Sequence, residues 1–125
     1  MSARKLVVAV TGIALIGALA LASLAGAHFR MASSVTIHGD KGDFHGLVTS
    51  KRASCLGHRK VVVYKQKGEV QLPGSDRDVG IDVTKRHGHH ARWSLDNTGF
   101  RHGDFYAYVR GTDDCKGDFT KTISI

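Results

Sequence analysis

The sequence predicts an all-β domain: a Greek-key β-sandwich of seven to eight short strands, preceded by an N-terminal signal-peptide helix. Helix-forming residues are scarce after position 27, where one Glu and four Leu occur without an apolar repeat at helical spacing. Short runs of Val, Ile and Thr take their place. Gly and Asp interrupt these runs about every 8–12 residues, which is the strand spacing of a sandwich.

Each run of β-branched and aromatic residues between turn residues predicts one strand. The turns at 39–42, 73–76, 96–99 and 112–114 contain Gly, which adopts positive φ, or Asp and Asn, which cap the backbone. Lys67-Gly68 indicates a tight hairpin between two short strands. In chain order, the expected strands are Ser34–His38, Asp43–Thr49, Arg59–Gln66, Glu69–Leu72, Gly80–Lys85, His90–Leu95, Gly103–Arg110 and Phe119–Ile125.

Side chains alternate between the two faces of a strand, so the core-facing residues follow from every second position. The predicted inward set is Phe44, Gly46, Val48, Val61, Val63, Ile81, Val83, Trp93, Leu95, Phe105, Ala107 and Val109. The predicted outward set is His45, Thr49, Asp82, Tyr106 and Tyr108. Exposed tyrosines are common on strands, so we interpret the two tyrosines as sheet-forming residues and not as a ligand platform.

Residues 1–27 have the pattern of a signal peptide. Arg4 and Lys5 precede the uncharged stretch Leu6–Leu24, and Ala25-Gly26-Ala27 provides the small residues of a cleavage site. Cleavage leaves residues 28–33 as a short flexible N-terminus and 34–125 as the domain, secreted or at the cell surface. The alternative is an uncleaved anchor, because the 19 residues of the apolar stretch are just long enough to cross a hydrocarbon core of about 30 Å.

The two cysteines, Cys55 and Cys115, both lie in the exported part. An even number of cysteines in an oxidising compartment predicts a disulfide. The bond would close a loop of about 60 residues, for which loop entropy predicts up to about 4 kcal/mol of stabilisation. The alternative is a pair of redox or metal-binding thiols, but neither cysteine is part of a C-x-x-C motif.

Several motifs along the chain resemble one family of secreted domains. They are F-H-G-L-V-T-S at 44–50, R-K-V-V-V-Y-K at 59–65, R-W-S at 92–94 and G-D-F-Y-A-Y-V at 103–109, together with both cysteines and the closing T-K-T-I-S-I. This pattern resembles the carboxypeptidase-regulatory-like, or transthyretin-like, domains of secreted bacterial proteins. The resemblance implies a prealbumin-type sandwich of seven or eight strands, an architecture that carries stalk, adhesion and carrier roles.

One enzymatic branch of that family, the hydroxyisourate hydrolases, ends in a Y-R-G-S tetrapeptide that contributes to the active site. The nearest string here is Tyr108-Val109-Arg110-Gly111-Thr112, which has an inserted residue and stands before the C-terminus. The sequence also lacks the G-x-S-x-G motif of a serine nucleophile. Its single Glu argues against catalysis by a pair of carboxylates. We therefore expect a protein that is not an enzyme.

The aspartates lie in separate turns beside basic residues and are interpreted as turn caps, not as a calcium site.

Histidines form the densest group of metal-ligating side chains. H-x-H-H at 87–90 provides imidazoles that suit Cu(II), Ni(II) or Zn(II), and an extended backbone would place His87 and His89 on one face. The alternative is a solvated loop, because Lys85, Arg86 and Arg92 surround the motif and oppose cation binding. We expect no cofactor unless this cluster binds a metal, in which case the predicted ligands are His87, His89, His90 and His102.

The exported part is basic. It keeps 16 of the 18 Lys and Arg residues against 11 acidic residues, which leaves a net charge of +5. Outside the membrane, such a charge attracts anionic polymers such as wall teichoic acids, acidic glycans or lipid headgroups. The alternative is a solubilising surface. The residues predicted to bind an anionic polymer are Lys51, Arg52, Arg59, Lys60, Lys65 and Lys67.

These observations favour a non-catalytic β-sandwich module, secreted or at the cell surface, that binds an anionic envelope component or has a structural role. The alternative is an extracytoplasmic metal-binding protein that uses its histidine cluster. No nucleic-acid recognition motif is present, so nucleic acid is not an expected partner. We expect a monomer that contacts the membrane only through an uncleaved signal segment.

Overall fold

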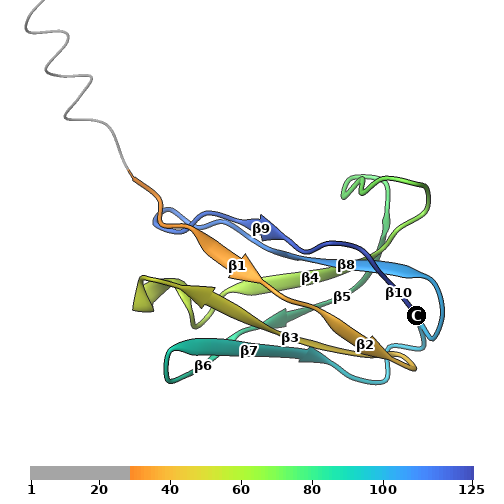
Figure 1. The fold of residues 1–125 in the computed structure, drawn as a ribbon, viewed down its shortest axis with the longest axis horizontal. Coiled ribbons are helices and arrows are strands. Elements are labelled where there is room, and N and C mark those ends of the chain that lie inside the picture. Colours follow the sequence, from red (N-terminus) through yellow and green to blue (C-terminus); the bar gives the residue numbers. More distant parts are fainter. Residues whose placement is uncertain (1–28) are drawn as a thin grey trace, which may run out of the picture.

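The computed structural model describes residues 29–125, which form two five-stranded antiparallel sheets packed face to face (Figure 1). This confirms the predicted β-sandwich. Sheet I has the strand order β1-β3-β7-β6, with β2 also paired to β3; sheet II has the order β10-β8-β4-β5, with β9 also paired to β8. The strands of sheet I are β1 (Ser33–Val35), β2 (His38–Asp40), β3 (Asp43–Ser50), β6 (Lys85–His87) and β7 (His90–Leu95). Those of sheet II are β4 (Lys60–Lys65), β5 (Arg77–Val83), β8 (Asp104–Val109), β9 (Asp118–Phe119) and β10 (Ile123–Ser124).

The predicted signal peptide, residues 1–27, lies outside the described residues. Within residues 29–125 no helix is long and apolar enough to cross a membrane; the one helical segment is the 3-10 turn η1 (Ala53–Cys55). Backbone pairing begins earlier than Ser34, because Met31 bridges Cys115 and β1 starts at Ser33. Met31 and Ser33, which the sequence assigned to the short N-terminus, therefore pair with residues of the sandwich.

Residues 29–125 form ten short strands where the sequence predicted seven to eight. The predicted strands Ser34–His38 and Phe119–Ile125 are each interrupted at a threonine. There the threonine hydroxyl, and not a backbone carbonyl, accepts the N–H of the neighbouring strand. Thr36 accepts the Leu47 N–H through Oγ1 at 2.9 Å between β1 and β2. Thr120 accepts the Ala107 N–H through Oγ1, also at 2.9 Å, between β9 and β10.

The strand predicted at Glu69–Leu72 and the hairpin at Lys67-Gly68 are wrong, because this segment is a loop between β4 and β5. The Asp76 carboxylate organises the loop: Oδ1 accepts the Lys67 N–H at 3.1 Å and Oδ2 accepts the Leu72 N–H at 2.8 Å. The Lys67 and Leu72 N–H groups therefore donate to a carboxylate and not to the backbone of a second strand, as they would in a hairpin. Figure 1 shows this loop projecting beyond the sheets.

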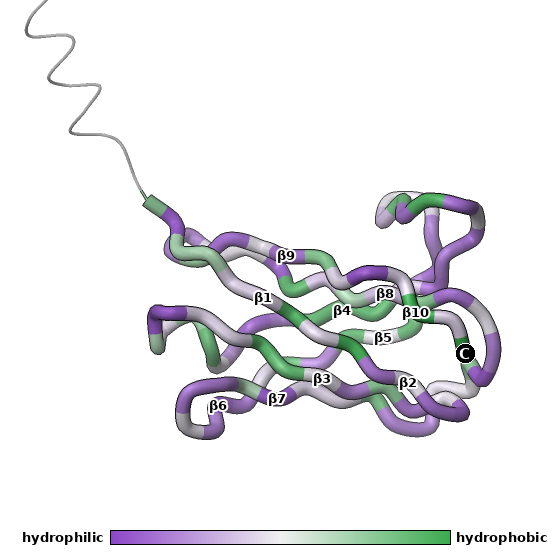
Figure 2. The backbone as a smooth tube through the Cα atoms, viewed as in Figure 1, coloured by the Kyte–Doolittle hydropathy of each residue, from purple (hydrophilic) through white to green (hydrophobic). Residues whose placement is uncertain are grey.

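The core lies between the two sheets, as the alternation of hydrophobic and hydrophilic residues predicts (Figure 2). Its fully buried members include Phe44, Val48, Val61, Val63, Phe105, Ala107 and Val109, and Trp93 is 2% exposed. All were predicted to point inward.

Ile81 and Val83 were predicted to point inward, and this prediction is wrong: they are 48% and 43% exposed. The register of β4 and β5 shifts between Val63 and Tyr64, which inserts Val79 as an unpaired residue. Ile81 therefore stands opposite Val62, on the outer face of sheet II. Asp82 is turned the opposite way from the prediction and accepts the Ser94 N–H of sheet I at 2.8 Å.

Tyr106 lies on the outer face of sheet II, as predicted, but it is fully buried. Its hydroxyl donates a 2.5 Å hydrogen bond to Asp76 of the β4–β5 loop. That bond, with the Leu72 N–H, lowers the pKa of Asp76. Burial, and then the bond to Asp76, raises the pKa of Tyr106. The loop thus covers a residue that the sequence placed at the surface, while Tyr108, half-buried, stacks on Phe119 with ring centroids 4.1 Å apart.

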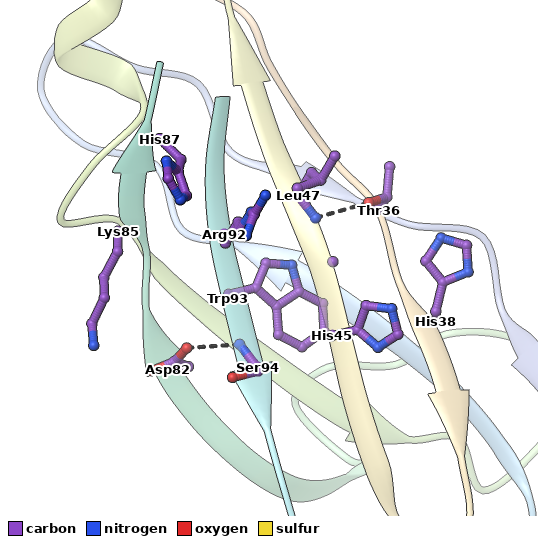
Figure 3. Close-up of a pocket in the computed structure, with 11 residues that line it drawn as sticks. Thr36, His38, His45, Leu47, Asp82, Lys85, His87, Arg92, Trp93 and Ser94 are labelled. Atoms are coloured by element: carbon purple, nitrogen blue, oxygen red, sulfur yellow. Dashed lines mark hydrogen bonds between the residues drawn. The ribbon is translucent and has the colours of Figure 1, made fainter. Parts of the chain in front are cut away.

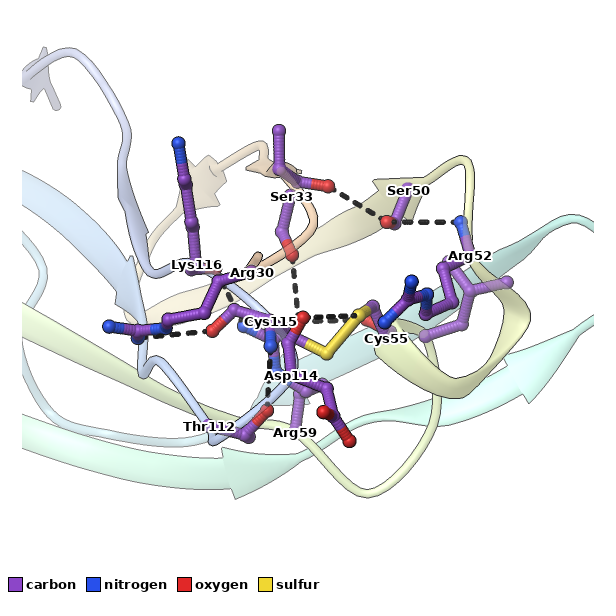
Figure 4. The surroundings of a disulfide bond; sticks show 12 residues. Arg30, Ser33, Ser50, Arg52, Cys55, Arg59, Thr112, Asp114, Cys115 and Lys116 are labelled. Carbon is purple, nitrogen blue, oxygen red and sulfur yellow. Dashed lines mark hydrogen bonds between the residues drawn. A yellow bond between two sulfur atoms is a disulfide. The ribbon is translucent and has the colours of Figure 1, made fainter. Parts of the chain in front are cut away.

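The disulfide predicted between Cys55 and Cys115 is present, with the two Cα atoms 5.7 Å apart (Figure 4). Both cysteines are buried. The bond joins η1 to the segment between β8 and β9, at the end of the sandwich where the described chain begins. A buried disulfide is compatible with an extracytoplasmic location.

Candidate functional site

A groove of about 750 Å³ lies on the outer face of sheet I (Figure 3). Its lining residues come from β2, β3, β7, β6 and the end of β5, together with Thr36 between β1 and β2, and most of them are polar. The register of these strands determines which side chains meet there, because directly opposed residues of antiparallel strands share a face.

Two histidines form the first cross-strand pair in the groove. His38 of β2 stands opposite His45 of β3. Their imidazole rings stack, with centroids 5.3 Å apart and an interplanar angle of 25°. Both side chains are exposed, so a ligand in the groove can reach them.

The second pair consists of two permanent cations. Lys85 of β6 stands opposite Arg92 of β7, and Arg92 in turn stands opposite Leu47 of β3. Like charges directly opposed across a sheet are destabilising. Among the described residues, neither cation has an ion-pair partner. The one carboxylate that lines the groove, Asp82, accepts a hydrogen bond from the Ser94 backbone.

The third pair is again formed by imidazoles. His87 of β6 stands opposite His90 of β7, with ring centroids 6.2 Å apart. His87 lines the groove, and His90 is half-buried beside it. The outer face of sheet I thus carries three cross-strand pairs in which both members are cationic or become cationic on protonation.

Trp93 and Gly46 form the floor of the groove. The two residues are directly opposed and both are buried, and the Trp93 side chain belongs to the core between the sheets. A Cβ on Gly46 would lie 1.9 Å from the Thr36 carbonyl oxygen and 2.7 Å from the indole Nε1 of Trp93. The absence of a side chain at position 46 therefore makes room for the indole, whose Nε1 has no hydrogen-bond partner in the described part of the chain.

Arg59, predicted to bind an anionic polymer, is instead 2% exposed. Its guanidinium donates five hydrogen bonds, all to groups near the disulfide. Nε and Nη2 bond the Arg110 carbonyl at 3.3 and 2.8 Å, and Nη2 also bonds Lys116 O at 3.0 Å. Nη1 bonds Cys55 O and Ser33 Oγ, each at 2.8 Å. Burial lowers the pKa of Arg59, and its role is to hold chain segments together.

The other residues of the predicted polymer site do not form one patch. Lys51 and Arg52 follow β3 at the disulfide end. Lys60 stands opposite Val83 on the outer face of sheet II. Lys65 lies at the other end of β4, with Nζ 6.0 Å from the centre of the Phe100 ring, and Lys67 belongs to the β4–β5 loop. Sequence proximity along Lys51–Lys67 is therefore not spatial proximity.

The four predicted metal ligands are also separated. Gly88, with φ of 68°, closes a tight turn, so His87 pairs with His90 and not with His89. His102 lies between the end of β7 and β8, whereas His87, His89 and His90 lie at the turn before β7. Residues 29–125 contain no group of three or more His, Cys, Asp or Glu side chains placed to hold a metal ion.

The sequence did not single out His38, His45, Lys85 and Arg92 together. His45 was predicted to point outward, and the alternation of β3 and β7 would have placed Leu47 and Arg92 outward as well. The pairing of β2 with β3 and of β6 with β7 brings them into one groove. No protein-family model matches this chain, and no curated protein or solved structure matches it either.

Proposed function

We propose that this protein is a non-catalytic β-sandwich module, secreted or at the cell surface, that binds an anionic ligand on the outer face of sheet I. The observation that carries the proposal is the set of three like-charged or protonatable cross-strand pairs along one groove. Each such pair opposes folding when both members are charged. An anion placed between them offsets this repulsion, so the arrangement favours an anionic ligand.

The chemistry of the groove suits carboxylate or phosphate groups. The Arg92 guanidinium has a planar set of donors that matches two oxygens of one anionic group, and Lys85 adds a mobile ammonium. Leu47, which is 37% exposed, provides an apolar surface beside Arg92.

The leader pattern and the disulfide support the proposed location. An oxidising compartment outside the cytoplasm allows the Cys55–Cys115 bond to persist. The anionic partner in that compartment is proposed to be a component of the cell envelope. Membership of the transthyretin-like group is likewise proposed, on the motifs quoted above.

The single tryptophan makes a direct test feasible, because Trp93 lies at the groove floor. The purified full chain, with its disulfide intact, is titrated with inorganic polyphosphate while indole fluorescence is recorded. We expect saturable binding that weakens steeply with salt, since the Debye length falls from about 10 Å at 0.1 M to about 3 Å at 1 M.

The matched variants separate the groove from general charge. Lys85→Gln/Arg92→Gln removes two groove cations, and Lys60→Gln/Lys121→Gln removes two exposed cations from the sheet II side. The groove variant is expected to bind polyphosphate at least about tenfold more weakly, and the control variant to bind like the wild type. Equal weakening in both variants would show that net charge alone attracts the polymer, and the proposal would fail.

A further inference from the structure

We infer that the ligand is an extended polyanion that runs across sheet I into two further hollows, and not a small anion confined to the groove. The inference rests on the proposed function and adds the length of the ligand to it. Two observations carry it: the hollows adjoin the groove through shared or directly paired residues, and each hollow adds at least one Lys or Arg that does not line the groove.

The first hollow, of about 480 Å³, lies at the β1 end of sheet I and includes Lys51, Ser34 and Thr49. Ser34 stands opposite Thr49, Thr49 opposite His90, and His90 opposite His87. A continuous row of exposed or half-buried polar side chains therefore leads from this hollow to the groove. Lys51 supplies its cation.

The second hollow, of about 510 Å³, lies beyond β6, between that strand and the turn after η1. Lys85 lines both this hollow and the groove. Arg86 and His58 line the hollow as well. His58 adopts a left-handed backbone conformation, with φ of 57°, and its N–H donates to Thr84 O at 2.9 Å, which holds it beside the strand.

The size of the face sets the length of the ligand. Four strands, β1-β3-β7-β6, separate the outer hollows, and a spacing of about 4.8 Å between neighbouring strands gives about 14 Å across them. A single phosphate or carboxylate cannot contact cations at both ends of that span. Of the residues that line the three hollows, Asp82 alone is acidic, so the whole path attracts negative charge.

The test compares tripolyphosphate with long-chain polyphosphate, at equal phosphate concentration and low salt, by calorimetry and Trp93 fluorescence. We expect the long chain to bind at least about tenfold more tightly, because linked charges engage several subsites at once. Its affinity should also fall more steeply with salt, since more phosphates are neutralised per bound chain.

A long chain can bind a single site in many overlapping positions, so tighter binding of the long chain does not by itself demonstrate an extended site. Variants distinguish the two explanations. Lys51→Gln/Arg86→Gln removes the Lys and Arg side chains that line the outer hollows but not the groove, and leaves Lys85 and Arg92 in place. We expect this variant to bind long-chain polyphosphate about five- to tenfold more weakly and tripolyphosphate like the wild type. Wild-type binding of both polymers by this variant would overturn the extended path and leave the groove intact. Failure of the unmodified protein to bind either polymer would instead overturn the proposed function.

Discussion

Lys85 and Arg92 stand directly opposite each other on β6 and β7, and neither has an ion-pair partner among the described residues. Two permanent cations in this position repel each other in the free protein. The same face places His38 opposite His45. The fold therefore tolerates unfavourable pairs on the face that forms the groove. The proposed anion binding rests on these pairs.

The first prediction concerns the cost of that repulsion. Lys85→Glu converts a like-charged pair into an opposite-charged pair, so the free energy of unfolding should rise by about 0.2–1 kcal/mol. Polyphosphate binding should weaken at the same time. Urea denaturation measures the first effect and Trp93 fluorescence the second. Lys60→Glu, opposite the uncharged Val83, is the control and should leave both nearly unchanged. A lower free energy of unfolding for Lys85→Glu would contradict the prediction.

The second prediction concerns the close approach at Gly46. In Gly46→Ala the new methyl group meets backbone atoms of Thr36 and the Trp93 indole at distances no Cβ tolerates. The strands must separate, so the free energy of unfolding should fall by about 1–3 kcal/mol. The control is Gly68→Ala, where nothing lies within 4 Å of the added Cβ. Equal stability of the two variants would show that sheet I adapts without cost at position 46.

The third prediction concerns the buried guanidinium of Arg59. Arg59→Lys keeps the positive charge but provides three donors in place of five, and loses the planar geometry. Carbonyl oxygens beside the disulfide then lack partners, so the free energy of unfolding should fall by about 1–3 kcal/mol. Arg101→Lys makes the same change at an exposed position and should have no measurable effect. Thermal and urea unfolding of the two variants provide the comparison.

The fourth prediction concerns the disulfide. Cys55→Ser/Cys115→Ser releases a loop with a sequence separation of 60 residues, so the free energy of unfolding should fall by up to about 4 kcal/mol. Mass analysis without reductant should find the natively produced protein lighter than its reduced form by one pair of hydrogen atoms. Recovery of two freely alkylatable thiols would contradict the assignment.

The fifth prediction concerns the pH dependence of the Asp76–Tyr106 contact. The folded pKa of Asp76 is lowered by the Tyr106 hydroxyl, so its stabilisation is present above the unfolded pKa of about 3.9 and is lost as the pH falls. The folded pKa of Tyr106 is raised by burial, so its stabilisation is present below about pH 10 and is lost as the pH rises.

Urea unfolding across this pH range tests both arms. Asp76→Asn should show a shallower loss of stability on the acid side, and Tyr106→Phe a shallower loss on the alkaline side. Both variants should also be less stable than the wild type near neutral pH. Tyr106→Phe loses the hydroxyl that donates to the loop, and Asp76→Asn replaces one acceptor oxygen with an NH2 group that cannot accept a hydrogen bond. Acid and alkaline profiles parallel to those of the wild type in both variants would contradict the assignment.

The sequence by itself determined the features that depend on local periodicity and on residue chemistry. Alternation along β3, β4, β7 and β8 identified the inward residues Phe44, Val61, Trp93 and Phe105, because a strand repeats every two residues wherever its partners lie. The turn sequence at 39–42 was identified from its Gly and Asp residues. The chain turns at Lys41 and Gly42, which have positive φ, whereas Gly39 and Asp40 belong to β2. The disulfide followed from there being two cysteines and an exported context.

The tertiary structure alone decided which residues meet. A one-residue bulge in β5 reversed the faces of Ile81 and Asp82, and the β4–β5 loop buried Tyr106. Arg59 is not available to a polymer, because its guanidinium is buried and bonded to carbonyl groups from distant parts of the chain. The groove depends on pairing between strands, and pairing is set by packing and hydrogen bonds across the whole sandwich. Lys85 and Arg92 are therefore neighbours only in the folded protein, where the register of β6 and β7 brings them together.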